Sequence, residues 1–522
     1  MANNSRTKNT ILNFTSSIIG QFITIIMQFA VRTVFIKTLG KSYLGISGLF
    51  SNILSMLSLA EMGIGSAIIF KLYEPLSKKD ESRIKILMNF YKVVYRYIGI
   101  VVAIIGVLVI PFLPKLINDY DKLQVLGINT VFIFCLYLFD SVASYLFLAY
   151  KSAIIKADQK EYNINLISYI FTISTGVIQI IALIVFVRFD IYVIITVIKT
   201  ILQNLIIALY VDRSYPFLKK QEKQRLSTAE AISIFKDCGA LFIYKINNVV
   251  VKSTDNIVLS AFIGLDCVAL YSNYLIFYTT IRGMIVKVFN SVGHSIGNLH
   301  AIGNSKKEYK VFESTMFISY ILGGTAFVGI FVVSDELIRM WIGSNWVILQ
   351  PFSFLMGLEI FTASVKQALA KYRTAYGLFR QGWARPLAGM VINLVLSIIL
   401  VKRMGITGVL VGTIVSDWAT CVWFDPIILH KNGFKKEFPV HIYFIKFVKN
   451  FIVVFAVGLI DYWICTNFMV GYGWGSVIVH AFICGITVPF ALYFMSFTTQ
   501  EAKYLRSIIN REVIKIKHKI LG

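Results

Sequence analysis

The chain has 522 residues, of which 57% are hydrophobic and only 15% are charged, and its mean hydropathy is +0.72. Apolar stretches of roughly 20 residues, the length that crosses the hydrocarbon core of a bilayer, recur along it. This composition excludes a large soluble domain and indicates an all-α polytopic membrane protein. The net charge of +24 raises the alternative of a nucleic-acid partner, which the placement of the charges decides below.

The first predicted span covers about 10–37 and carries a polar stripe on an otherwise apolar helix. Gln21, Gln28 and Arg32 follow one another at steps of seven and four, so they share one face. Hydrogen bonding between helices is sufficient to explain why Ser17 and Thr24 occur in the same stripe. It is not sufficient for Arg32, because a charge at membrane depth has to face water or a partner.

Five further spans complete a first half of the chain. The second span contains Glu61, and the fourth, at 127–150, contains Asp140 near its middle. The polar connection 213–237 then carries Ser227 and Glu230 at the spacing of a capping box. This pattern predicts a short amphipathic helix at the membrane surface that links two halves.

The span that follows this link has the densest charge at membrane depth. Lys245, Asn248, Lys252 and Asp255 fall at steps of three, four and three, which places them on one helix face. Each Lys or Asp near the bilayer centre costs about 2.5 to 3.5 kcal/mol, so this face is predicted to be wet. For Asp255, an ion pair with Lys252 one turn away is an equally good explanation.

The eighth predicted span presents an aromatic stripe that ends in a guanidinium. Tyr271, Tyr274, Tyr278 and Arg282 follow at steps of three, four and four, and Arg282 lies roughly 16 Å into the span. Arg matches phosphate through its planar fork of donors, and Tyr offers a ring and a hydroxyl to a sugar. Tyr271 and Tyr274 are also close enough to the outer boundary to serve as interfacial anchors.

Six more spans bring the predicted total to fourteen, arranged as two six-helix lobes plus two C-terminal helices. The resulting domains are an N-lobe, a linker, a C-lobe, a helix pair and a basic tail, at 1–212, 213–237, 238–432, 433–499 and 500–522. Six spans on each side of a linker indicate a repeat of parallel orientation. Such a repeat is expected to bring the polar faces of both lobes to one central cationic cavity.

The loop charges predict the orientation in the membrane. With the N-terminus inside, inward loops and tails hold about 33 Lys and Arg against about 8 outside, which places both termini in the cytoplasm. The basic excess therefore requires no nucleic acid. The six cysteines lie mostly within spans and offer neither a disulfide framework nor a metal-ligand pair, so no metal and no cofactor are expected.

Local motifs in the second half resemble those of a known family. They read Ser253-Thr-Asp255-Asn-Ile, Tyr271-Ser-Asn-Tyr274, Ser295-Ile-Gly-Asn298-Leu, Ala375-Tyr-Gly-Leu-Phe379 with Arg385-Pro386, Ile392-Asn-Leu-Val-Leu-Ser397 and Gly405-Ile-Thr-Gly-Val-Leu-Val-Gly-Thr413. The chain resembles, over essentially its whole length, the Wzx-type polysaccharide flippases of the multidrug/oligosaccharidyl-lipid/polysaccharide exporter superfamily. The resemblance implies a non-enzymatic transporter in a bacterial cytoplasmic membrane.

The substrate that the resemblance implies is an oligosaccharide linked to undecaprenyl diphosphate and used for capsule or exopolysaccharide synthesis. A polysaccharide polymerase and a chain-length regulator are then expected partners, and the transporter is expected to be a monomer that works by alternating access. The candidate ligands of the diphosphate are Arg32, Lys245, Lys252 and Arg282. The candidate sugar contacts are Gln21, Gln28, Asn248, Tyr271, Tyr274 and Tyr278. The candidate counter-ions or ion-coupling residues are Glu61, Asp140, Asp255 and Asp417.

Three other functions compete with this one. A lipid II flippase shares the fold and a cationic cavity, and only the local motifs argue against it. A drug or cation antiporter would favour a cavity dominated by carboxylates, whereas cations here match or outnumber them. A polysaccharide polymerase usually has a large outward loop, and every predicted outward loop here is short. No nucleotide-binding P-loop is visible, so ATP is not a direct energy source.

Cysteine labelling tests the predicted orientation. In a chain whose native cysteines are replaced by Ser, a membrane-impermeant thiol reagent added outside should label Ser42→Cys and Asp266→Cys. It should not label Lys79→Cys or Lys220→Cys until the membrane is permeabilised. Labelling of Lys220→Cys from outside would overturn the topology.

Overall fold

The structure is a computed structural model, and it divides the chain into two compact units, Met1–Ala269 and Leu270–Gly522. It describes residues 2–58, 64–118, 120–125, 127–146, 148–219, 226–302, 304–378, 381–382, 384–434, 438–467, 473–499, 501–503 and 506. Every regular element in these ranges is a helix, which agrees with the predicted all-α class.

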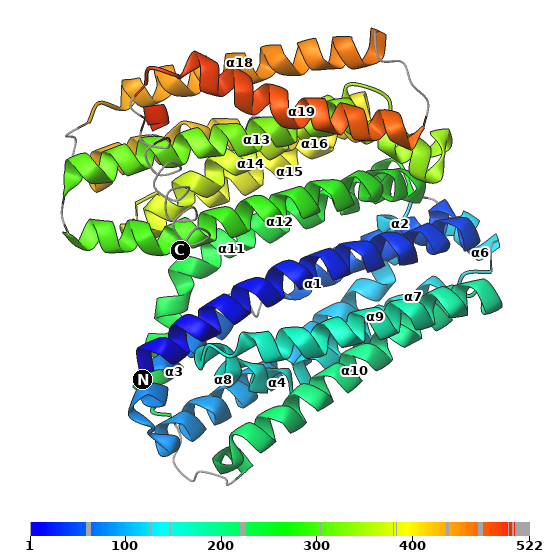
Figure 1. The fold of residues 1–522 in the computed structure, drawn as a ribbon. Helices are drawn as coiled ribbons and strands as arrows, with labels where there is room; N and C mark the ends of the chain where they lie inside the picture. The colour runs from blue at the N-terminus through cyan, green and yellow to red at the C-terminus, as the bar shows by residue number, and fades with distance from the viewer. Residues whose placement is uncertain are drawn as a thin grey trace, which may run out of the picture. The chain divides into compact units, whose positions relative to one another are not determined.

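The first unit contains eleven α-helices joined by short turns and 3-10 segments (Figure 1). They are α1 (Ala2–Thr38), α2 (Lys41–Leu57), α3 (Ile64–Lys78), α4 (Glu81–Val109), α5 (Leu113–Leu116), α6 (Tyr120–Val125), α7 (Thr130–Leu146), α8 (Ser152–Ala157), α9 (Glu161–Phe186), α10 (Phe189–Ser214) and α11 (Thr228–Phe262). Helix α1 packs along α9, and α10 packs against both α7 and α9. Helix α4 packs against both α3 and α7, so many neighbouring helices of this unit are distant in the sequence.

The short amphipathic helix predicted within the linker is the first part of the 35-residue α11. Ser227 caps α11 as expected, because its hydroxyl accepts a hydrogen bond from the backbone N–H of Glu230 at 3.2 Å. The helix then continues to Phe262 because no proline interrupts it. Helix α11 packs against α2 and α3, so it belongs to the first unit. The lobe boundaries given above remain a prediction.

The second unit starts within α12 (Leu265–Ile302) and is organised around α13 (Ser305–Ile342). Helix α13 packs against α14 (Phe352–Ala375), α18 (Val440–Asn467) and α19 (Trp474–Met495) (Figure 1). Helix α15 (Ala384–Met404) pairs with α16 (Ile406–Asp417). Two π-helical segments, Trp418–Val422 and Leu429–Gly433, flank the short α17 (Phe424–Ile428).

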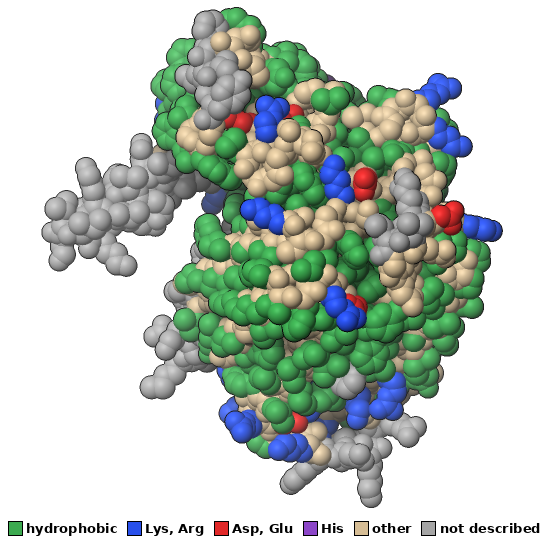
Figure 2. All heavy atoms as spheres, turned by 90° about the vertical axis from the view of Figure 1, so that its right-hand side faces the viewer, with side chains coloured by type: hydrophobic (Ala, Val, Ile, Leu, Met, Phe, Trp, Pro, Cys, Tyr) green, Lys and Arg blue, Asp and Glu red, His purple; other side chains and the backbone are tan. Residues whose placement is uncertain are grey.

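Nine helices among the described residues are long and apolar enough to cross a membrane, and a tenth span is possible if α7 and α8 form one bent crossing. The predicted number of fourteen is therefore not confirmed. Four predicted spans fall outside this set, namely the second, which contains Glu61, and those on α11, α12 and α14. The last three helices carry many of the polar residues singled out by the sequence. The outer faces of the spans are apolar, as shown by exposed Ile104, Leu108, Ile184, Ile486 and Phe490. Figure 2 shows hydrophobic side chains over much of one face, with charged side chains in scattered places.

Two glycines set the distance between α15 and α16. A Cβ at Gly408 would lie 2.4 Å from the carbonyl oxygen of Leu400, and one at Gly412 would lie 2.9 Å from the backbone nitrogen of Ser397. The spacing Gly-x-x-x-Gly lets the two backbones approach, which is a common way to pack membrane helices. Asn393 on α15 adds a hydrogen bond to the Thr413 hydroxyl at 2.9 Å.

A methyl group at this contact should destabilise the second unit. We expect Gly408→Ala to lower the midpoint of thermal unfolding in detergent, because overpacking a close contact against backbone costs about 1 to 3 kcal/mol. Gly485→Ala is the matched control, since a Cβ there meets no atom within 4 Å. The control should keep or slightly raise the midpoint, because Ala favours a helix more than Gly does. Equal midpoints for the two variants would contradict the role of Gly408.

Candidate functional site

The first unit has a polar face at membrane depth that is built from four helices. Arg32 on α1 is half-buried, and its guanidinium interacts electrostatically with the hydroxyls of Tyr137 on α7 and Tyr192 on α10. The Tyr137 hydroxyl donates a hydrogen bond to the hydroxyl of Ser47 on α2 at 2.8 Å. All of these side chains are partly accessible, so they line a polar surface instead of closing a dry core.

Two charged residues extend this face. Asp140 lies about one turn beyond Tyr137 on α7, and Lys199 lies about two turns beyond Tyr192 on α10. The Asp140 carboxylate interacts electrostatically with the Lys199 ammonium and is hydrogen-bonded to Thr200. Both charged side chains are half-buried. The predicted counter-ion Asp140 therefore has a cation of its own unit as a neighbour.

The second unit has a corresponding polar face around Arg282. The Arg282 guanidinium carbon lies 6.0 Å from the centre of the Tyr278 ring on the same helix. It also interacts electrostatically with Glu359 on α14 and Asp417 at the end of α16. Arg282 and Glu359 are half-buried, whereas Tyr278 is 4% exposed. The structure thus brings together three predicted residues, Arg282, Tyr278 and Asp417, within one unit.

Asp417 has a direct cationic partner. Its carboxylate lies 2.6 Å from the Lys366 ammonium of α14, and their side chains are 12% and 24% exposed. Asp417 is the last residue of α16, immediately before the π-helical segment Trp418–Val422. Segments of π-helix inside α-helices are frequent at functional sites, and this one holds a charged pair at membrane depth.

A second ion cluster joins α14 to α15 and α17. Asp425 accepts hydrogen bonds from Arg373 and from Arg385, the latter at 2.6 Å, and all three side chains are at most 10% exposed. Arg373 also donates to the carbonyl oxygens of Leu378 and Gln381. This cluster is nearly closed to solvent and both guanidinium groups contact the Asp425 carboxylate, which is typical of a structural element and not of a ligand site.

The other predicted residues divide into those whose surroundings are described and those outside the description. Tyr274 is fully buried; its hydroxyl donates to Asp335 at 2.7 Å and accepts from the backbone N–H of Ile348. Asp255 is 4% exposed on α11. The remaining described members are half-buried Gln21, exposed Gln28 and buried Tyr271. Outside the description lie Glu61 and the side chains of Lys245, Asn248 and Lys252.

Sequence reasoning missed the charged face of α14. Glu359, Lys366 and Arg373 follow at steps of seven, which puts them on one side of a helix. That spacing inside a predicted span was the available signal. It also missed Tyr137 and Tyr192, because isolated tyrosines in apolar helices carry no pattern of their own.

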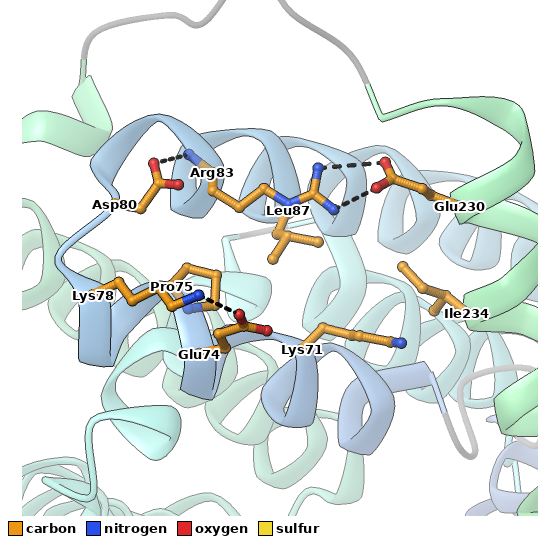
Figure 3. Close-up of a pocket in the computed structure, with 9 residues that line it drawn as sticks. All are labelled: Lys71, Glu74, Pro75, Lys78, Asp80, Arg83, Leu87, Glu230 and Ile234. Carbon is orange, nitrogen blue, oxygen red and sulfur yellow. Dashed lines mark hydrogen bonds and ion pairs between the residues drawn. The ribbon is translucent and has the colours of Figure 1, made fainter.

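A further polar cavity of about 400 Å³ lies at the end of the first unit that the charge distribution places inside (Figure 3). Arg83 on α4 spans its upper edge to Glu230 on α11, with N···O distances of 2.7 and 3.3 Å. Lys78 pairs with Glu74 on α3 at 2.6 Å. The hydrogen bonds from these cations lower the pKa of both glutamates below the ordinary value. Because the pairs are exposed, each contributes little to stability.

Comparison with known proteins identifies the class of fold. No family model and no curated protein sequence matches the chain. Its fold is similar to that of solved membrane transporters. The likeness to solved structures includes the lipid II flippase MurJ in an inward closed conformation, with 16% identity and a TM-score of 0.62 over 94% of this chain and 99% of that one.

Two MATE transporters share the fold. An inward-facing multidrug resistance MATE family transporter of the MOP superfamily has 14% identity and a TM-score of 0.58, over 80% of this chain and 96% of its own. A mutant of the Vibrio cholerae MATE transporter VcmN has 15% identity and a TM-score of 0.51, over 83% of this chain and 99% of its own. At these identities the likeness establishes the fold alone.

Removing the carboxylate of the closed ion cluster should destabilise the protein. We expect Asp425→Asn to lower the free energy of unfolding by about 3 to 5 kcal/mol, because two buried guanidinium groups lose their counter-charge. The midpoint of thermal unfolding in detergent measures the effect. Glu74→Gln removes a carboxylate from an exposed pair and should leave the midpoint unchanged. An unchanged midpoint in Asp425→Asn would show that the cluster does not stabilise the fold.

Proposed function

We propose that the protein is a flippase that moves undecaprenyl-diphosphate-linked oligosaccharide across the cytoplasmic membrane of a bacterium by alternating access. The observation that carries the proposal is the pair of half-buried guanidinium groups, Arg32 and Arg282, at membrane depth in a MOP-superfamily fold. A diphosphate cannot cross about 30 Å of hydrocarbon unaided, so its carrier has to supply cations within the membrane. Guanidinium groups bind phosphate oxygens with two parallel hydrogen bonds.

The neighbours of both arginines suit a sugar as well as a phosphate. Tyr137 and Tyr192 accompany Arg32, and Tyr278 accompanies Arg282, so each cation has phenolic rings beside it. Such rings pack against the apolar faces of sugar rings, and their hydroxyls form hydrogen bonds. The capsule or exopolysaccharide class of substrate rests on the sequence resemblance.

A lipid II flippase is the second candidate. The likeness to MurJ, which covers 94% of this chain, favours it. Lipid II and a capsule precursor are both sugars on a lipid diphosphate, so the arginine chemistry supports both equally. A drug or cation antiporter is the weaker alternative, because half-buried Arg32 and Arg282 would repel a cationic substrate.

The test is a translocation assay with purified protein in lipid vesicles. The substrates are lipid-linked repeat units extracted from the host membrane, and lipid II. A lectin or glycosidase outside the vesicle then reports the glycans that have crossed. Faster transfer of the repeat unit than of lipid II supports the proposal, and the reverse order supports the second candidate. If the vesicles transfer neither the repeat unit nor lipid II but expel a cationic dye, both flippase functions are wrong and the antiporter is supported.

Substitution of the two arginines tests the residues. We expect Arg32→Ala and Arg282→Ala to slow transfer roughly 10- to 150-fold each, since charge-assisted contacts contribute about 1.5 to 3 kcal/mol. Arg→Lys at either site should restore only part of the rate, because a point charge cannot reproduce the guanidinium fork. Arg213→Ala, at the exposed end of α10, is the control with unchanged rate. Normal transfer by both alanine variants, with equal protein in the membrane, would contradict the assignment.

A further inference from the structure

A second cavity of the first unit lies at the end of its helices that the charge distribution places outside. It has a volume of about 350 Å³, which is the space of roughly twelve liquid water molecules at about 30 Å³ each. The start of α2, the turn before α7 and the start of α10 build its wall. All of its lining residues belong to the first unit, so the cavity does not depend on the second.

Three aromatic rings line the cavity. Tyr43 is half-buried, Phe132 is 46% exposed, and Phe189 is 4% exposed beneath them. The rings of Tyr43 and Phe189 meet edge to face with 5.5 Å between their centres. An exposed ring such as Phe132 gives a ligand an apolar platform at the membrane surface.

Three planar polar side chains complete the lining. The Arg188 guanidinium donates hydrogen bonds to the Asp190 carboxylate from Nε at 3.1 Å and from one Nη at 2.5 Å. Its remaining N–H groups can donate to a ligand. Arg188 is 64% exposed and Asp190 is 21% exposed, so both are reachable from the cavity. The Asn129 side chain fixes the start of α7 by accepting a hydrogen bond from the Phe132 N–H at 3.0 Å, and its amide N–H₂ adds donors.

The balance of charge identifies the class of ligand. Among the residues that line this cavity, Arg188 is the one cation and Asp190 the one carboxylate, and they neutralise each other. A phosphate would meet a carboxylate beside the single guanidinium, and a divalent cation would find too few oxygen ligands. A neutral molecule with many hydroxyls and an apolar face suits rings flanked by planar donors and acceptors.

Aromatic contacts connect this cavity to Arg32. Phe189 stacks on Tyr192 with 6.3 Å between ring centres, and Tyr192 is the phenol that interacts with Arg32. Phe35 of α1 touches both rings, at 5.7 Å to Phe189 and 5.0 Å to Tyr192. A continuous set of rings therefore leads from the polar face at membrane depth to the outer cavity within one unit.

We propose that the cavity between Tyr43, Phe132 and the Arg188–Asp190 pair is a carbohydrate subsite that holds the glycan part of the substrate at the outer face. The inference rests on the proposed function for its place in transport, since a sugar leaving Arg32 meets these rings next. Aromatic platforms hold the glycan in any orientation about the ring, while the Arg188–Asp190 pair bonds its hydroxyls.

Binding of a soluble sugar tests the subsite without transport. The probe is the oligosaccharide released by mild acid from the lipid-linked pool of the host membrane, added to the full-length protein in detergent. Saturation-transfer NMR and calorimetry measure binding. Phe132→Ala and Arg188→Ala should each weaken it about tenfold, the change that corresponds to about 1.4 kcal/mol. The controls Phe112→Ala and Lys115→Ala change exposed residues outside the cavity lining and should bind like the wild type.

The outcomes separate the subsite from the proposed function. Wild-type protein that does not bind the oligosaccharide, or that binds it equally well in Phe132→Ala and Arg188→Ala, overturns the subsite. If that protein still transfers the lipid-linked unit, the flippase proposal stands. If binding depends on Phe132 and Arg188 but the protein transfers no lipid-linked sugar, the subsite is supported and the proposed flippase function is contradicted. Inorganic phosphate that competes with the sugar would also overturn the neutral-ligand assignment.

Discussion

A charge within a membrane-length helix needs water or a counter-charge, and this constraint organises both units. The first unit meets it with a partly accessible face, where Arg32 lies among phenols and Asp140 lies beside Lys199. The second unit meets it with ion pairs that α14 makes with the end of α16 and with α17. Helices that would otherwise slide freely in an apolar medium are therefore held in one register by their charges.

Exposure separates the charges that hold the fold from those that can meet a ligand. Asp425 is bonded to two guanidinium groups, and none of the three side chains is more than 10% exposed. The Lys366–Asp417 pair is more open, with Lys366 at 24%, and Arg282 beside it is half-buried. An incoming anion can approach half-buried Arg282 while the Lys366–Asp417 pair stays intact, whereas at Asp425 it would have to break a closed cluster.

The sequence predicted the class of fold and several charged positions, because membrane helices can be recognised from their length and hydropathy. Spacing found Arg32 and Arg282, since each continues a stripe on one helix. It missed Tyr192 and the partner of Asp417, because contacts between helices depend on how distant segments pack. The number of spans was hardest to derive, because polar and charged residues in helices such as α12 interrupt the apolar pattern by which a span is recognised.

The π-helical segment after Asp417 explains how two carboxylates meet one row of cations. Lys366 and Arg373 are seven residues apart, close to two full α-helical turns, so both face the same way. Asp417 and Asp425 are eight residues apart, which in a regular α-helix would rotate the second carboxylate roughly 80° past two turns. The wider turn at Trp418–Val422 absorbs the additional residue. Asp425 is thereby returned to the side of α14, and the open pair and the closed cluster share one helix interface.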